Sequence, residues 1–138
     1  MSYRFNPFTG QLDLVGNNGS TTVNADVVDV VFEAAEIIPA LKVVYGSSPS
    51  QVSIASSLMP HKPLGLALNA ALAGQSVTVR CFGEVSDLSF GFAVDEPLFC
   101  NALGNLSSTP VIVGYHTEVA HGLGAGKVFV NVKNQIVL

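Results

Sequence analysis

The sequence is short of charge. Lys, Arg, Asp and Glu make up only 12% of its 138 residues, about half of the usual ~25%. The six basic residues stand singly and the net charge is −4, so no basic surface for nucleic acid is expected. The hydrophobic share is 49% and the mean hydropathy is +0.47, which leaves few charges to cover a small protein. We therefore expect an obligate oligomer or a component of a larger assembly.

Other features are missing as well. No apolar run reaches transmembrane length, and the N-terminus lacks the apolar stretch of a signal peptide, so we expect no membrane partner and synthesis and folding in a cytosol. The two cysteines, Cys81 and Cys100, form no close-spaced motif, which favours reduced, buried thiols. Tryptophan is absent, which weakens the case for a sugar-binding cleft.

The clearest element that is present is a strand over residues 76–85. Val77, Val79 and Cys81 fall on one side of an extended chain, and the residues between them fall on the other. This alternation indicates a strand with one buried face. Residues 65–70 before it are predicted to form a partner strand, and residues 71–75 a glycine-containing turn, so that the whole is a hairpin.

A similar arrangement returns near the C-terminus. Residues 114–117 lead through the glycine-rich stretch 122–126 into alternating residues 127–132. We interpret this as a weak internal repeat of the first hairpin, with a loop two residues longer.

Further short strands are predicted between these hairpins and around them. Residues 41–45 and 51–55 are expected to pair across a turn at 46–50. The other predicted strands cover residues 98–100 and 135–138, and a bend into a strand is predicted at 87–94. Short strands with frequent turns favour an all-β fold, a small barrel or sandwich of antiparallel strands, with residues 21–138 as a single domain.

Residues 24–38 can be read in two ways. Asp26, Asp29, Glu33 and Glu36 would share one stripe of a helix, whereas the many valines and isoleucines of the same stretch are typical of strands. Pro39 ends whichever element precedes it. We favour a strand just before Pro39 and leave the rest open between helix and strand.

The candidate phosphate and metal motifs fail on their details. Residues 122–127 superficially resemble a phosphate loop, but His121 and Val128 stand where that motif needs Gly and Ser or Thr. His116 and His121, expected within one loop, and the distant His61 do not have the spacing of metal ligands. We therefore expect no metal ion and no cofactor.

The sequence contains no convincing set of catalytic residues. The carboxylates of Asp95 and Glu96, or of Glu84 and Asp87, could serve a glycosidase, but both pairs flank expected turns and are better explained as solvated turn acids. No nucleophile elbow of the form Gly-x-Ser-x-Gly occurs. The sequence thus predicts a protein that is not an enzyme.

The first twenty residues differ from the rest. Residues 1–16 are aromatic and rich in turn signals, and residues 17–20 are typical of a flexible linker. An apolar segment separated by a linker suggests an extended arm that docks on a partner; the alternative is that it folds back as an edge strand of its own domain. The arm residues expected to bind the partner are Tyr3, Arg4, Phe5, Asn6, Pro7, Phe8, Thr9, Gly10, Leu12 and Leu14.

This segment also carries a resemblance. The stretch Tyr3-Arg4-Phe5-Asn6-Pro7-Phe8-Thr9-Gly10-Gln11-Leu12-Asp13-Leu14-Val15-Gly16 resembles the opening of many tailed-bacteriophage virion proteins, which begin with an aromatic Phe-Asn-Pro-x-Thr-Gly segment, a polar linker and a small β domain. The body resembles the capsid decoration and head- or tail-fibre type. The body features that match are residues 40–45, 65–67, 77–85, 97–99, 113–114, 129–132 and 136–138, whereas residues 24–33 match no part of the pattern.

The resemblance implies a function without catalytic residues. Proteins of this type are typically trimers that stiffen the particle or link a fibre to it. It implies a homotrimeric capsid decoration (cement) protein that binds the major capsid protein, or another virion protein, on the virion surface. A tail-fibre, baseplate or host-receptor-binding module is the alternative, followed by a small carbohydrate-binding or carbohydrate-active protein.

Overall fold

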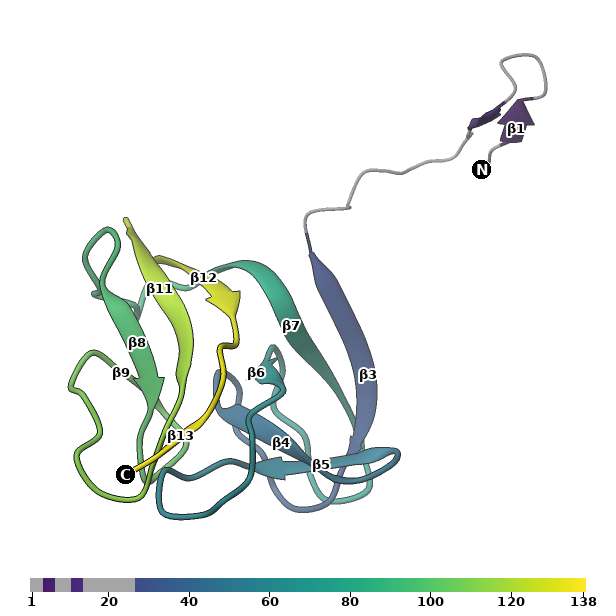
Figure 1. Cartoon of the computed structure of the whole chain (residues 1–138). Helices are drawn as coiled ribbons and strands as arrows, with labels where there is room; N and C mark the ends of the chain where they lie inside the picture. The colour runs from purple at the N-terminus through teal and green to yellow at the C-terminus, as the bar shows by residue number, and fades with distance from the viewer. Residues whose placement is uncertain (1–3, 7–10, 14–26) are drawn as a thin grey trace.

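The computed structural model describes residues 4–6, 11–13 and 27–138, and every regular element in them is a β-strand (Figure 1). The all-β prediction is therefore confirmed. The strands are β1 (Arg4–Asn6), β2 (Gln11–Asp13), β3 (Val28–Ala34), β4 (Val43–Ser48), β5 (Gln51–Ile54), β6 (Gly65–Ala67), β7 (Ser76–Ser86), β8 (Pro97–Cys100), β9 (Leu106–Ser107), β10 (Tyr115–His116), β11 (Glu118–Gly124), β12 (Lys127–Asn131) and β13 (Ile136–Val137).

Five strands close into a small barrel. They follow one another in the order β3-β5-β4-β6-β7, and β7 pairs again with β3. Four of the five contacts are antiparallel, and the fifth, between β3 and β5, is parallel and only two residue pairs long. The longest contacts of the ring are those of β3 with β7 and of β4 with β5, whereas β6 joins each of its neighbours, just as β3 joins β5, through two residue pairs.

The nine-stranded sheet continues beyond the barrel through β7 into a part that we call the second sheet. The strands β12, β11, β8 and β9 follow β7 in that order, and in Figure 1 they lie beside the barrel on the side of the C-terminus. The long strand β7 serves both parts: Val77 and Val79 are buried in the barrel, and Val85 is buried with β12 and β8. Gly83, with φ 124°, lies between these halves.

The protein has two hydrophobic cores that share a wall. Along β4, Val44 packs inside the barrel whereas Val43 packs in the other core, because successive side chains of a strand point to opposite faces. Leu66 and Ala67 of β6 divide in the same way. The part of the wall formed by Val43 and Val44 of β4 and by β6 is therefore buried on both faces, and this explains why these residues do not alternate with polar ones.

A glycine allows the close contact between β6 and β7. A Cβ atom at Gly65 would clash with the backbone carbonyl of Arg80, in the segment where Leu66 pairs with Arg80. Only a residue without a side chain fits there.

The first predicted hairpin and the β4–β5 hairpin are confirmed, with ends shifted by a few residues. β6 pairs antiparallel with β7, and β4 with β5. The strands predicted at 98–100 and 135–138 are present as β8 and β13. Residues 28–34 form a strand, which excludes a helix there; the helical stripe of acids was a coincidence of spacing in a strand whose pattern is set by its valines. The strand favoured just before Pro39 was wrong, because β3 ends at Ala34 and Ile38 makes only an isolated bridge with Ala71.

The prediction for the second hairpin was wrong in its pairing. The partner of β12 is β11, and Ala125 and Gly126 alone join them. Residues 115–116 pair instead with the C-terminal β13. The left-handed backbone of Gly124, Ala125 and Gly126 (φ 78°, 55° and 76°) makes a tight turn, so the glycines mark a turn of two residues and the internal repeat does not hold.

Two smaller predictions were also wrong. Residues 87–94 contain no strand in this described part of the chain and form turns and irregular backbone. Phe90 and Phe92 of this segment nevertheless pack against the second core, which accounts for the apolar pattern that suggested a strand. His116 and His121 lie on separate strands, β10 and β11, and do not share a loop.

Candidate interaction surface

Near the C-terminus the protein exposes a group of large apolar side chains, which we call the C-terminal patch. Ile112 is 85% exposed and Val137 is 72% exposed. Seven of the sixteen exposed large hydrophobic side chains of the described residues belong to this patch. Its members are Leu58, Met59, Ile112, Val113, Ile136, Val137 and Leu138.

Backbone contacts hold the three segments of the patch together. The amide of Tyr115 donates to the carbonyl of Ser57 (2.8 Å), and the amide of Leu138 donates to the carbonyl of Gly114 (2.9 Å). Strand β10 pairs with β13 through Tyr115 opposite Val137 and His116 opposite Ile136. The three segments that carry the exposed apolar side chains are therefore held next to one another by their backbones.

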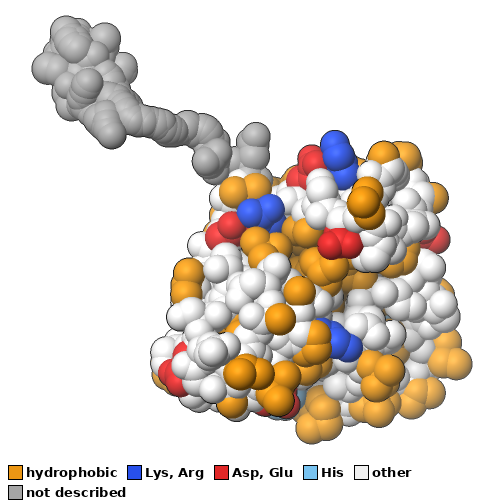
Figure 2. All heavy atoms as spheres, turned by 180° about the vertical axis from the view of Figure 1, so that it is seen from behind, with side chains coloured by type: hydrophobic (Ala, Val, Ile, Leu, Met, Phe, Trp, Pro, Cys, Tyr) orange, Lys and Arg blue, Asp and Glu red, His pale blue; other side chains and the backbone are white. Residues whose placement is uncertain are grey.

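The patch contains no charged side chain within residues 56–60, 111–116 or 135–138. The adjoining charges are those of Lys62, Glu118 and Lys133. Charge is sparse elsewhere too: Figure 2 shows hydrophobic side chains spread over the rear face between a few acidic and basic ones. An apolar centre with a charged rim is the usual composition of a protein–protein interface.

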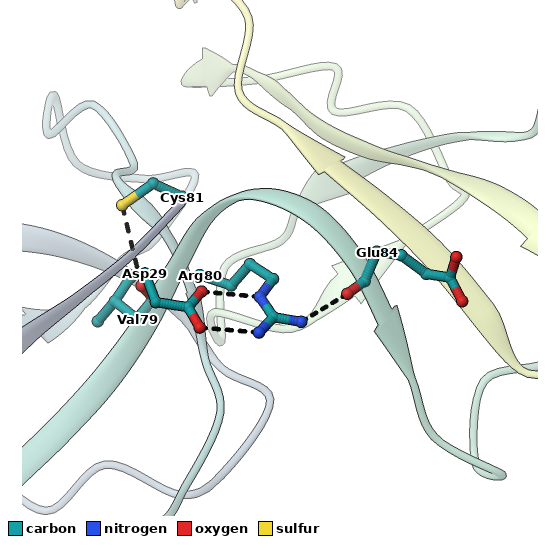
Figure 3. A network of polar contacts seen from close by, with 5 residues as sticks. All are labelled: Asp29, Val79, Arg80, Cys81 and Glu84. Carbon is teal, nitrogen blue, oxygen red and sulfur yellow. Dashed lines mark hydrogen bonds and ion pairs between the residues drawn. The ribbon is translucent and has the colours of Figure 1, made fainter. Parts of the chain in front are cut away.

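The best-defined polar site joins β3 to β7 (Figure 3). Arg80 donates from Nε and Nη2 to the two carboxylate oxygens of Asp29 (2.7 and 2.8 Å) and from Nη1 to the backbone carbonyl of Glu84 (2.6 Å). The guanidinium lowers the pKa of Asp29, and the same hydrogen bonds raise the pKa of Arg80. All three nitrogens of the guanidinium are engaged, so the arrangement is a structural clamp.

An aromatic row lies beside this clamp on the same outer face. Phe82 meets Phe129 edge to face at 5.0 Å, and Phe129 lies 5.5 Å from His121. Lys127 pairs with Glu84 nearby (3.4 Å). The rings cover one another across β7, β12 and β11, and Phe82 remains 39% exposed.

The histidines and cysteines do not form a reactive centre. Within residues 4–6, 11–13 and 27–138, the structure contains no group of three or more potential metal ligands. His61 stacks on Tyr45 (4.1 Å), and His116 packs against Phe99 (4.4 Å). Cys81 and Cys100 are free thiols, and burial raises the pKa of both, that of Cys100 to about 11. Neither thiol is activated as a nucleophile.

Two of the four candidate carboxylates serve turns, as predicted, whereas Glu84 lies within strand β7 and pairs with Lys127 of β12. Asp87 accepts hydrogen bonds from the amide and hydroxyl of Ser89 (2.8 and 2.7 Å), which lower its pKa. Glu96 accepts from the amide of Ala93 (3.0 Å). The acids are thus used by the local backbone, an arrangement typical of turn acids.

Two hollows in the described surface are too small for an ordinary ligand. One, of about 150 Å³, is lined by apolar residues that include Ile37, Ala71 and Leu72. The other, of about 210 Å³, lies between Leu41, Phe90 and Leu106. Sites for small molecules usually measure about 300–1,000 Å³.

The arm residues are described only in part. Arg4, Phe5 and Asn6 lie on β1 and Leu12 lies on β2, and the two strands pair antiparallel, with Phe5 opposite Leu12. The described part of the segment predicted to be an arm is therefore a β-hairpin. The remaining predicted arm residues, Tyr3, Pro7, Phe8, Thr9, Gly10 and Leu14, lie outside the described residues, as does the linker 17–20.

The C-terminal patch was not predicted from the sequence. The hairpin predicted to begin at residues 114–117 gave no indication of an exposed apolar loop directly before it. The structure instead leaves Ile112 and Val113 exposed on a loop. The only signal for such a surface was the overall shortage of charge.

In the part of the chain that the structure describes, no helix has the length and hydropathy needed to cross a membrane. Comparisons with known proteins find no family model that matches this chain and no curated protein with significant similarity to it.

Proposed function

We propose that this protein is a structural subunit of an assembly, a homotrimeric capsid decoration protein of a tailed bacteriophage that binds the major capsid protein and stabilises the shell. The observation that carries the proposal is the C-terminal patch. Large exposed apolar patches mark interaction sites, and the three segments of this patch carry seven exposed large apolar side chains, are joined by backbone hydrogen bonds and contain no charged side chain.

The patch suits self-association through its lack of charge. Around the three-fold axis of a trimer the same residues of three copies meet, so charged side chains there would repel one another, whereas uncharged apolar ones do not. Fully burying one Ile, Leu or Val side chain contributes roughly 1.5–3 kcal/mol. Several such side chains per copy are enough to offset the loss of freedom on association.

The arm supplies the second contact in this proposal. Its apolar residues, led by Phe5 and Phe8, bind the capsid protein or a neighbouring subunit, and the symmetry of the oligomer multiplies the contacts. The free thiols, the turn acids and the small hollows suit a binding role better than a catalytic one.

Light scattering of the purified protein tests the self-association. We expect a trimer for the natural sequence and monomers for the double variant Ile112→Asp/Val137→Asp. Leu88→Asp is the matched control, because Leu88 is 100% exposed on a distant turn, and it should leave the oligomer unchanged. A natural protein that is monomeric at micromolar concentration would overturn the proposed assembly.

Immunogold electron microscopy of purified phage particles tests the location. A decoration protein is labelled over the whole shell. Label confined to the tail would replace the capsid proposal with the fibre or baseplate alternative. Deleting residues 1–16 should leave the β body folded and lower the amount of protein bound to particles; unchanged occupancy would remove the arm from the proposal.

A further inference from the structure

Strand β3 is only partly paired along its length. Val28–Glu33 pair with β7 on one side, but on the other side only Glu33 and Ala34 pair with β5. Within the described residues, no strand pairs with the remaining side of β3 from Val28 to Phe32. The barrel therefore has an open edge of five residues at the place where the chain enters it (Figure 1).

The hydrogen-bond pattern shows which backbone groups face this edge. The amide of Ala34 donates to Gln75 next to β7 (2.8 Å), and the amide of Glu33 donates in the other direction, to Ser50 at the start of β5 (2.9 Å). Because bonding alternates along an antiparallel strand, Val31 and Asp29 point to the same side as Glu33. Among residues 4–6, 11–13 and 27–138, no strand pairs with the N–H and C=O groups of Asp29 and Val31 on this side.

Three side chains along this edge are valines, which are typical of strands inside a sheet, but here they are exposed. Val31 is 64% exposed, Val28 is 49% exposed and Val30 is 40% exposed. Exposed edges of this kind, apolar and with an unused ladder, are sites where proteins add a strand.

The N-terminal hairpin of β1 and β2 is a candidate for the strand that pairs with this edge. Strands β1 and β2 form a two-stranded sheet of their own, and an isolated hairpin of two strands is only marginally stable in water. Each of these strands has three residues, which fits an edge of five residues that is closed at its far end by Ser50.

Charge selects β1 as the strand that makes the contact. The edge strand carries Asp29 and Glu33 and no basic residue, whereas β1 carries Arg4 and β2 carries Asp13. Asp29 is already paired with Arg80, so Glu33 is the acid left to attract Arg4.

We propose that the hairpin β1–β2 of a neighbouring copy adds to the open edge of β3, with β1 next to β3. Thirteen residues, 14–26, separate Asp13 from Val27; they span roughly 45 Å when extended, enough to reach an adjacent subunit. If each subunit of a closed oligomeric ring gives its hairpin to the next subunit, every hairpin gains a third strand and every β3 edge is paired. This inference rests on the proposed function, because it needs an oligomer.

Disulfide trapping tests it. Two chains with different tags are co-expressed, one carrying Phe5→Cys and the other Val30→Cys or Val31→Cys; since successive side chains face opposite sides, one of the two positions faces Phe5. Mild oxidation should give a covalent heterodimer at least tenfold above the level with Leu88→Cys, an exposed control on a distant turn. Native Cys81 and Cys100 have raised pKa values and should contribute little.

The outcomes separate the two proposals. A trimer without the heterodimer overturns the strand addition and leaves the assembly standing. A monomer overturns both. A third outcome is that a single chain carrying both Phe5→Cys and Val31→Cys forms an intramolecular disulfide, while the mixed chains form no intermolecular one. The hairpin would then pair with β3 of its own chain, which overturns the proposal that it comes from a neighbouring copy.

Discussion

Arg80 and Asp29 form a two-pronged ion pair that ties β7 to β3 beside an irregularity in their pairing, where the register shifts between Val28 and Asp29. The third arm of the guanidinium holds the carbonyl of Glu84, on the far side of Gly83. One side chain thus fixes both the closure of the barrel and the bend that carries β7 into the second sheet.

Breaking this pair should destabilise the fold. We expect Asp29→Asn to lower the free energy of unfolding by about 1–2 kcal/mol, since charge-assisted hydrogen bonds are strong but this pair is partly exposed to solvent. Denaturant titration at pH 7 measures the change. Asp95→Asn, at an exposed turn, is the control and should change stability by less than ~0.5 kcal/mol. Equal effects of the two variants would contradict the structural role of the clamp.

The contribution of Asp29 should also depend on pH. Its pKa in the folded protein is lowered by Arg80, so the stabilisation is fully present above the ordinary pKa of about 3.9 and is lost as pH falls through the folded value. The difference in unfolding free energy between the natural protein and Asp29→Asn should therefore be constant from pH 7 to 5 and shrink below pH 4. A difference that grows on acidification would show that the pair is not the cause.

The contact of β6 with β7 gives a test that compares two glycines. Gly65→Ala would drive a Cβ into the carbonyl of Arg80, so the strands must separate, and we expect a loss of more than 2 kcal/mol of stability. Gly91→Ala is the matched control because nothing lies within 4 Å of a Cβ there. Thermal unfolding of both variants decides the matter; similar melting temperatures would mean that β6 can shift without cost.

The strands could be predicted from the sequence where one face is buried and the other is exposed. Val77 and Val79 alternate with Thr78 and Arg80, so the sequence pattern of β7 predicted both the strand and the face that is buried. The same logic located β5, whereas β4 and β8 were located as short apolar runs between turns. What it could not give was the division of β4 and β6 between two cores, because a strand buried on both faces carries no alternation.

The interaction surface was less accessible to prediction. Ile112 and Val113 look like core residues in sequence, and only the pairing of β10 with β13 places them outside. That pairing joins residues twenty or more positions apart, and no local pattern encodes it. The open edge of β3 is hidden for the same reason, since it depends on how short the contact with β5 is.

The thiols offer a last prediction about the cores. Cys100 lies in the second core, and burial raises its pKa to about 11, so at pH 8 only about one molecule in a thousand carries the reactive thiolate. We expect iodoacetamide at pH 8 to leave Cys100 unmodified for hours in the folded protein and to modify it within minutes in guanidinium chloride, as read by peptide mass spectrometry. Cys81 is half-buried beside Asp29, which together with burial raises its pKa, and it should react at an intermediate rate. Rapid labelling of native Cys100 would mean that the sheet of β8 and β11 opens readily, which would contradict the packing described for this core.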